Sequence, residues 1–87
     1  MIKLIGLAVA GPGELELSFS DGSSARWSAD PLIARDTVLT RPLRDENYFS
    51  RVFLEAGALA WPNGLELSAA SLHRKLDDAG KLIRRAA

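Results

Sequence analysis

The 87-residue sequence has no cysteine, a single histidine and no apolar run long enough to span a membrane. Without cysteine there is neither a disulfide framework nor a thiolate metal site, which fits a cytoplasmic protein. Without a long apolar run no transmembrane helix is expected, and therefore no membrane partner. His73 cannot build a histidine-based metal site alone, and we expect it to be a partly exposed surface residue.

The sequence also lacks a catalytic constellation. Its serines have no histidine partner at a recognisable spacing, and no nucleophile elbow is present. Asp77 and Asp78 are neighbours on a predicted helix, where they point about 100° apart and cannot share one site. We therefore expect a non-enzymatic protein with no catalytic residue, no cofactor and no metal. An enzyme that uses a metal bound by carboxylates remains an alternative.

Net charge is absent as well, because 11 Lys and Arg residues balance 11 Asp and Glu residues. The balance is uneven, with a net charge of −3 over residues 1–72 and of +3 over residues 73–87. Basic residues near a helix C-terminus interact favourably with the helix dipole. A basic tail can also bind nucleic acid or an acidic partner. Earlier in the chain, Arg41, Arg44 and Arg51 lie near Tyr48 in the sequence and are expected to form local ion pairs rather than an electropositive patch.

What the sequence does contain is a strand pattern. Leu15, Leu17 and Phe19 alternate with polar residues over 14–20, which predicts a strand with one buried face. Asp21-Gly22 is a hairpin signal that leads into a second strand at 24–28. Further strands are expected at 3–10, 51–55 and 58–61. Together these patterns predict an α+β domain with one small antiparallel sheet of about five short strands.

Two short helices are expected between the strands, at 31–35 after Asp30 and at 46–50 after Asp45. The segment between these helices reads as irregular, with Val38, Leu39 and Leu43 directed toward the core. One domain accommodates all these elements, since a chain of this length can fold around a single core.

The stretch from Gly57 to Ser68 organises the second half of the chain. Trp61-Pro62-Asn63-Gly64 predicts a type I turn followed by a left-handed glycine. Trp61 is the expected core anchor, with Trp27 against the same core. Ser68 is the expected N-cap of the terminal helix.

The terminal helix is predicted from about Ala69 to Arg84, because apolar residues recur every three or four positions from Leu72 to Ile83. Gly80 interrupts this pattern, at a cost of about 1 kcal/mol relative to alanine. The basic end of the helix is expected to span residues 77–87, beyond what a small core needs. We therefore expect removal of residues 80–87 to weaken partner binding and to leave the fold intact.

Several motifs occur in an order that resembles a family of small bacterial proteins known as domain of unknown function 2442. The resemblance covers about residues 5–76, and its most specific part is Trp61-Pro62-Asn63-Gly64 followed by Glu66. The other motifs are Phe19-Ser20-Asp21-Gly22, Asp30-Pro31-Leu32-Ile33 and Pro42-Leu43-Arg44-Asp45. The resemblance implies a compact α+β fold with an antiparallel sheet and implies no activity. Some longer relatives carry a helix-turn-helix segment, and relatives tend to be encoded beside another small protein, as toxin–antitoxin pairs are.

The resulting functional hypothesis is a regulatory or interaction protein, the antitoxin-like partner in a two-gene module. Its expected contact surface is the terminal helix or the exposed turn, with the residues Leu76, Leu82, Ile83 and Arg84, or Pro62 and Asn63. The alternative is a nucleic-acid-binding module that uses Arg74, Lys75, Lys81, Arg84 and Arg85. A homo-oligomer formed through an uncovered sheet edge is a further expectation.

Overall fold

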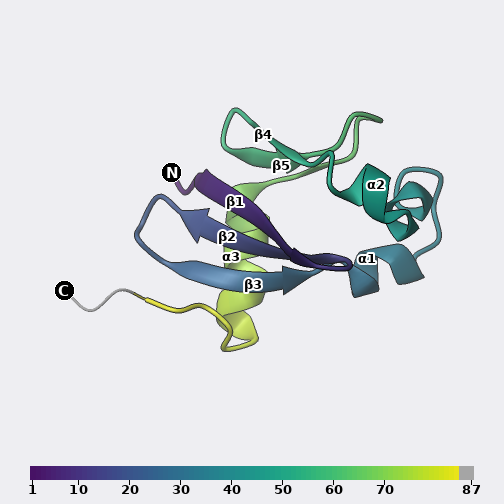
Figure 1. Ribbon diagram of the computed structural model, residues 1–87. Coiled ribbons are helices and arrows are strands. Elements are labelled where there is room, and N and C mark those ends of the chain that lie inside the picture. The colour runs from purple at the N-terminus through teal and green to yellow at the C-terminus, as the bar shows by residue number, and fades with distance from the viewer. Residues whose placement is uncertain (85–87) are drawn as a thin grey trace.

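The structure is a computed structural model, and it describes residues 1–84. It is an α+β fold, as predicted, but its strands form two three-stranded antiparallel sheets instead of one sheet of about five strands (Figure 1). In sheet order the strands are β1 (Leu4–Gly11), β2 (Glu14–Phe19) and β3 (Ser24–Ser28), then β4 (Phe53–Glu55), β5 (Ala58–Ala60) and β6 (Glu66–Leu67). The helices are α1 (Asp30–Ala34), the 3₁₀ helix η1 (Arg41–Arg44), α2 (Glu46–Phe49) and α3 (Ala69–Asp78). None of these helices, within residues 1–84, is both long and apolar enough to cross a membrane.

A backbone hydrogen bond joins the two sheets where the start of β1 reaches the β4–β5 turn. The Leu4 N–H donates to the Gly57 carbonyl oxygen at 2.8 Å, and β1 and β4 form no ladder beyond it. Ala56 and Gly57 both have positive φ, which suits the tight turn of a hairpin. A Cβ on Gly57 would lie 2.9 Å from the Cβ of Lys3, so the close approach requires glycine. Alternating hydrophobicity predicts strands but not their partners, which is why one sheet was expected.

The core lies between the first sheet and α3, which crosses behind that sheet (Figure 1). Leu15, Leu17 and Phe19 are completely buried, as their alternation predicts. Trp61, the residue after β5, is 1% exposed and packs against Phe49 with ring centroids 5.9 Å apart. The α3 helix contributes its apolar stripe to the same cluster of side chains.

The N-cap predicted for α2 is confirmed, and the N-cap predicted for α1 is displaced by one residue. Asp45 is the N-cap of α2 and accepts from the Asn47 N–H at 2.8 Å. The α1 helix instead begins at Asp30 itself, and its N-cap is Ala29, which has no side chain to bond the first turn. The difference of one residue falls within the normal fraying of helix ends.

The inward orientation predicted for Val38, Leu39 and Leu43, between α1 and α2, is wrong for two of these three residues. Leu43 is buried, but Val38 is 81% exposed and Leu39 is 42% exposed. Thr37 and Thr40 bond each other through their hydroxyls and backbone, and Thr40 is the buried residue of this turn. The turn closed by the two threonines directs Val38 and Leu39 toward solvent.

The terminal helix is shorter than predicted, because α3 ends at Asp78. Gly80 has a φ of +69°, and its N–H donates to the Asp77 carbonyl oxygen at 3.0 Å. The next N–H, of Lys81, donates to the Leu76 carbonyl oxygen at 2.8 Å. This pair of bonds is a Schellman motif, which satisfies the last carbonyls of a helix and stops it.

Residues 81–84, which we call the C-terminal strap, leave α3 and lie beside β3 (Figure 1). Ile83 and Ser24 exchange two backbone hydrogen bonds, of 2.9 Å and 2.7 Å. Leu82 packs against the core, whereas the side chain of Ile83 is 68% exposed. The segment predicted as a helix end therefore covers part of the outer edge of β3 instead.

Candidate functional site

An open groove of about 500 Å³ lies between β3 and α1 on one side and α3 on the other. Trp27 of β3, Leu32 of α1 and Leu67 of β6 line it, together with Lys75 of α3 and Lys81 of the strap. Its volume falls in the range of pockets that hold ligands in proteins. We name it the β3–α3 groove.

The helical period of α3 gathers one wall of the groove. Leu72, Lys75, Leu76 and Ala79 lie on the same helix face because they are three or four residues apart. Leu72 and Leu76 are each 5% exposed, so they tie α3 to the core and leave Lys75 at the rim. The helix begins at the expected N-cap, where the Ser68 hydroxyl oxygen accepts from the Ser71 N–H at 3.1 Å.

The floor of the groove is apolar. Trp27 packs against Trp61 with ring centroids 6.3 Å apart, and it lies against the core that contains Trp61, as predicted. Trp27 is only partly buried, and so are Leu32 and Leu67, which pack against the outside of the core. The three side chains come from three different elements and present apolar surface to a ligand.

The rim of the groove is mainly basic. Arg35, Lys75 and Lys81 are exposed, and none of them forms an ion pair within residues 1–84. Arg26 also lines the groove, but its guanidinium is shared with Glu14 at 3.4 Å and with Glu16 at 3.7 Å. Glu66 is the one acidic residue in the lining that the structure describes. The groove can therefore bind an apolar group and an anion together.

Two of the three serine hydroxyls in the lining, those of Ser28 and Ser68, are engaged in local structure. The Ser28 oxygen accepts from the Asp30 N–H at 3.2 Å, and the Ser68 oxygen caps α3. Within the described part of the chain, no three His, Asp or Glu side chains come together as ligands for a metal ion.

A second polar cluster lies on the other side of the strap, around Asp21. The His73 Nε2 atom is 2.8 Å from Asp21 Oδ2, and the His73 ring makes an edge contact with Phe19. Arg84 is 3.2 Å from Asp77 and 3.8 Å from Asp21. His73 is thus partly exposed, as predicted, and the cluster connects the strap to α3 and to the β2–β3 turn.

Hydrogen bonds to the Asp21 carboxylate lower its pKa. The Ser23 hydroxyl and N–H both donate to Asp21, and with His73 they lower the pKa of that carboxyl to about 2, from 3.8. A carboxyl whose pKa is lowered by folding stabilises the folded state above its unfolded pKa. That stabilisation is lost as the pH falls from about 4 toward 2.

The variant Asp21→Asn is therefore expected to lose less stability than the parent protein between pH 4 and pH 2, and to be less stable at pH 7. Urea unfolding measured at several pH values tests this. Asp78→Asn is the matched control, because Asp78 is exposed and forms no ion pair within residues 1–84. A parallel loss of stability in Asp21→Asn and the parent would contradict the assignment.

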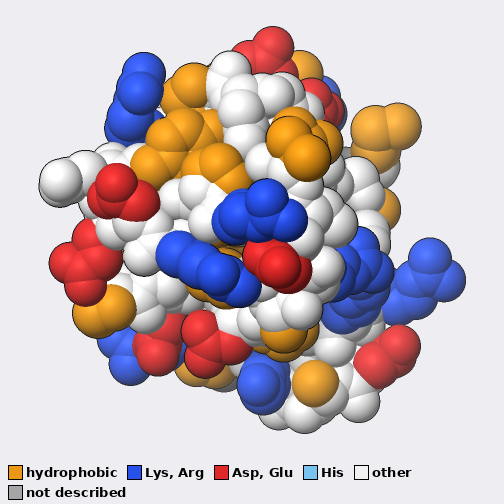
Figure 2. Space-filling model, turned by 90° about the vertical axis from the view of Figure 1, so that its right-hand side faces the viewer, with side chains coloured by type: hydrophobic (Ala, Val, Ile, Leu, Met, Phe, Trp, Pro, Cys, Tyr) orange, Lys and Arg blue, Asp and Glu red, His pale blue; other side chains and the backbone are white. Residues whose placement is uncertain are grey.

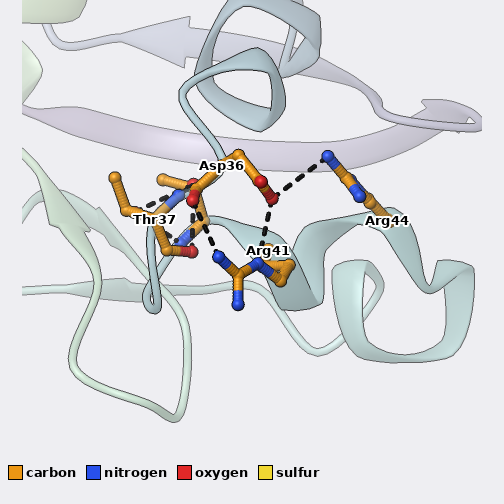
Figure 3. A network of polar contacts seen from close by, with 5 residues as sticks. Asp36, Thr37, Arg41 and Arg44 are labelled. Atoms are coloured by element: carbon orange, nitrogen blue, oxygen red, sulfur yellow. Dashed lines mark hydrogen bonds and ion pairs between the residues drawn. The ribbon is translucent and has the colours of Figure 1, made fainter.

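Two of the three arginines around α2 form local ion pairs, as the sequence predicts, whereas Arg51 forms none within residues 1–84. Arg41 Nε is 2.9 Å from Asp36 Oδ1, and Arg44 is 3.2 Å from the same atom (Figure 3). The hydrogen bond from Arg41, with the charges of Arg41 and Arg44, lowers the pKa of Asp36. Figure 2 views the end of the molecule that carries α1 and α2, and it shows basic and acidic side chains interspersed across the middle of that face. No continuous positive field covers this face.

The residues expected to contact a partner are scattered by the structure. Leu76 is 5% exposed and belongs to the core, so it offers little surface beyond its place in the wall of the β3–α3 groove. Leu82 is partly buried, and Ile83 and Arg84 lie in the strap. At the exposed turn, Pro62 projects into solvent, but Asn63 is held by three hydrogen bonds.

Asn63→Ala is expected to destabilise the fold by about 1–2 kcal/mol, because two side-chain hydrogen bonds are lost. The Asn63 amide donates to the Leu39 carbonyl oxygen at 3.1 Å and its oxygen accepts from the Leu65 N–H at 3.1 Å. Thermal unfolding would show a decrease in Tm of roughly 4–15 °C for a domain of this size. Asn47→Ala serves as control, since that side chain makes no hydrogen bond within residues 1–84. Equal stability of the two variants would count against the role given to Asn63.

The cationic residues expected to bind nucleic acid also lie in different parts of the structure. Lys75 and Lys81 line the groove, Arg74 lies on α3 outside the lining, and Arg84 is paired with Asp77. Arg85 lies outside the described residues. Since α3 stops at Asp78, these side chains do not form one helical stripe.

Only some residues of the β3–α3 groove can be identified from the sequence. Lys75 and Lys81 were named as cations, but Arg35, Leu32 and Leu67 were not singled out, because they belong to separate elements. The protein is thus a small α+β protein whose groove has an apolar floor and a mainly basic rim. Comparison with protein-family models, with curated proteins and with solved structures gives no match.

Proposed function

We propose that this protein is a non-enzymatic regulatory or interaction protein that binds a protein partner through the β3–α3 groove. The observation that carries the proposal is the open apolar floor of Trp27, Leu32 and Leu67 beneath a basic rim. Apolar surface surrounded by polar groups is typical of protein interaction sites. The resemblance to domain of unknown function 2442 supports the same function and adds that the partner is encoded beside this protein, as in a toxin–antitoxin pair.

The test is affinity purification of the full chain from its source cells at moderate salt, with mass spectrometry and nucleic-acid absorbance on the same eluate. A stoichiometric small protein encoded by the neighbouring gene is the expected result. A protein that elutes alone in every growth and stress condition would contradict the proposal.

The alternative function is nucleic-acid binding, and one feature favours it. Lys75 and Lys81 flank an aromatic side chain, Trp27, in the same groove, and single-stranded nucleic acids bind to combinations of cations and aromatic rings. Binding of this kind would weaken steeply as salt is added. Absence of binding to single-stranded oligonucleotides at low salt would remove the alternative.

Self-association through β1 remains part of the proposal. Among the described residues, 1–84, β1 pairs only with β2, and its eight residues include neither a charge nor a proline that would discourage edge pairing. Sedimentation equilibrium over a wide concentration range tests this expectation. A monomer at every concentration would remove it.

A further inference from the structure

We propose that the β3–α3 groove recognises an acidic segment of a partner protein, in which an apolar side chain is flanked by Asp and Glu residues. The inference rests on the proposed function and specifies the chemistry of the partner. It depends on the floor of the groove, on its rim and on the charge of the rest of the chain.

The floor selects an apolar anchor. Trp27, Leu32 and Leu67 each retain exposed apolar surface inside a volume of about 500 Å³. Transfer of an apolar side chain from water into such a site contributes the main attraction in most peptide recognition. Trp27 is also held in place by its contact with Trp61, so its ring is pre-organised for binding.

The rim selects negative charge. Arg35, Lys75 and Lys81 come from α1, α3 and the strap, so cations stand on more than one side of the floor. No carboxylate within residues 1–84 pairs with any of the three, which leaves them available to a ligand. Glu66 opposes them as a single acid in the lining. Complementary charge at a rim sets specificity and orientation for a partner.

These features favour an acidic peptide over a nucleic acid. A polyanion gains most from many free cations along an extended surface, but Arg26, Arg41, Arg44 and Arg84 are each paired with Asp or Glu. The chain has no net charge, so it exerts no long-range attraction on a polyanion. The groove instead offers a compact apolar site with a few cations, which fits one apolar side chain with adjacent carboxylates.

The test uses the full-length protein and two synthetic peptide libraries. In the first, Leu, Phe or Trp is flanked by Asp and Glu, and in the second the same anchors are flanked by Lys and Arg. A single-stranded oligothymidine is the third probe. We expect selection from the acidic library only, with the largest NMR shift changes at the Trp27 indole N–H and at the amides of Arg35, Lys75 and Lys81.

Charge reversal then locates the site. Lys75→Glu is expected to weaken the selected peptide by roughly tenfold or more, because an attraction becomes a repulsion. Arg74→Glu is the matched control, since it places the same charge on the next residue of α3, outside the groove lining. It should leave peptide affinity within about twofold. Melting temperatures of both variants establish that each is folded.

Three results would overturn the inference. The basic library could be selected equally well, the shift changes could map away from the groove, or Arg74→Glu could weaken binding as much as Lys75→Glu. Salt-sensitive binding of oligothymidine in preference to acidic peptides would replace it with nucleic-acid recognition. If the partner purified from source cells is retained in full by Lys75→Glu, the protein is still an interaction protein, but the assignment of its contact surface to the groove fails. If no partner is found, the function fails by itself.

Discussion

Replacement of Trp61 by alanine is expected to destabilise the protein by about 3–5 kcal/mol, the range seen for large aromatic residues removed from a core. Trp61 is 1% exposed, lies between Phe49 and Trp27, and donates its indole N–H to the Phe49 carbonyl oxygen at 3.0 Å. A domain of this size has a total stability of roughly 4–13 kcal/mol. Trp61→Ala should therefore be partly or wholly unfolded at room temperature, as measured by far-ultraviolet circular dichroism and urea unfolding.

Two variants separate the contributions of Trp61. Trp61→Phe keeps an aromatic ring and loses the indole N–H, but the Phe49 carbonyl oxygen still accepts from the Val52 N–H at 3.2 Å. We therefore expect a smaller loss than for alanine, about 1–3 kcal/mol. Val38→Ala is the surface control and should change stability by less than about 0.5 kcal/mol, since Val38 is 81% exposed. A fully stable Trp61→Ala variant would contradict its place at the centre of the core.

Local signals in the sequence predicted local structure well. The alternation of Leu15, Leu17 and Phe19 correctly assigned the buried face of β2, and Asp45 and Ser68 correctly marked the starts of α2 and α3. Each of these signals acts within a few residues, where side-chain size or a capping oxygen decides the conformation. The α+β class follows from them.

The errors concern contacts between distant segments. Nothing in the strand pattern indicates that the backbone of β1 bonds the second sheet at Gly57 without forming a ladder with it, so the pattern predicts one sheet instead of two. Gly80 was recognised as a break, but the apolar residues Leu82 and Ile83 continued the helical period by coincidence. They belong to a strap that bonds Ser24, almost sixty residues earlier in the chain.

The groove could not be predicted from the sequence for the same reason, because its residues come from distant segments of the chain. Its floor combines β3, α1 and β6, and no periodicity connects Trp27, Leu32 and Leu67. The basic residues of the C-terminal region were noted as a charge imbalance, and only the fold separates Lys75 and Lys81, which line the groove, from Arg84, which is paired with Asp77. The charge distribution along the sequence thus indicates a basic C-terminal region. The tertiary structure indicates which of its basic side chains form ion pairs within residues 1–84 and which do not.

Truncation after Gly80 is expected to destabilise the protein by about 2–4 kcal/mol, contrary to the expectation from sequence that the fold would remain intact. The truncated chain loses the Lys81 bond that closes α3, both backbone bonds between Ile83 and Ser24, and the packing of Leu82 against the core. Urea unfolding of this chain, compared with a chain that ends at Arg84, assigns the loss to residues 81–84.

Substitutions within the strap distinguish the contribution of its backbone hydrogen bonds to stability from that of its side chains. Ile83→Pro removes the N–H that donates to the Ser24 carbonyl oxygen at 2.7 Å and should reproduce about 1 kcal/mol or more of the loss. Ile83→Ala should have little effect, because that side chain is 68% exposed. Lys81 also lines the groove, so truncation is expected to weaken peptide binding even where the chain is still folded. Unchanged stability in both the truncated chain and Ile83→Pro would mean that the strap is not part of the folded unit, and partner binding lost on truncation would then be assigned to direct contact.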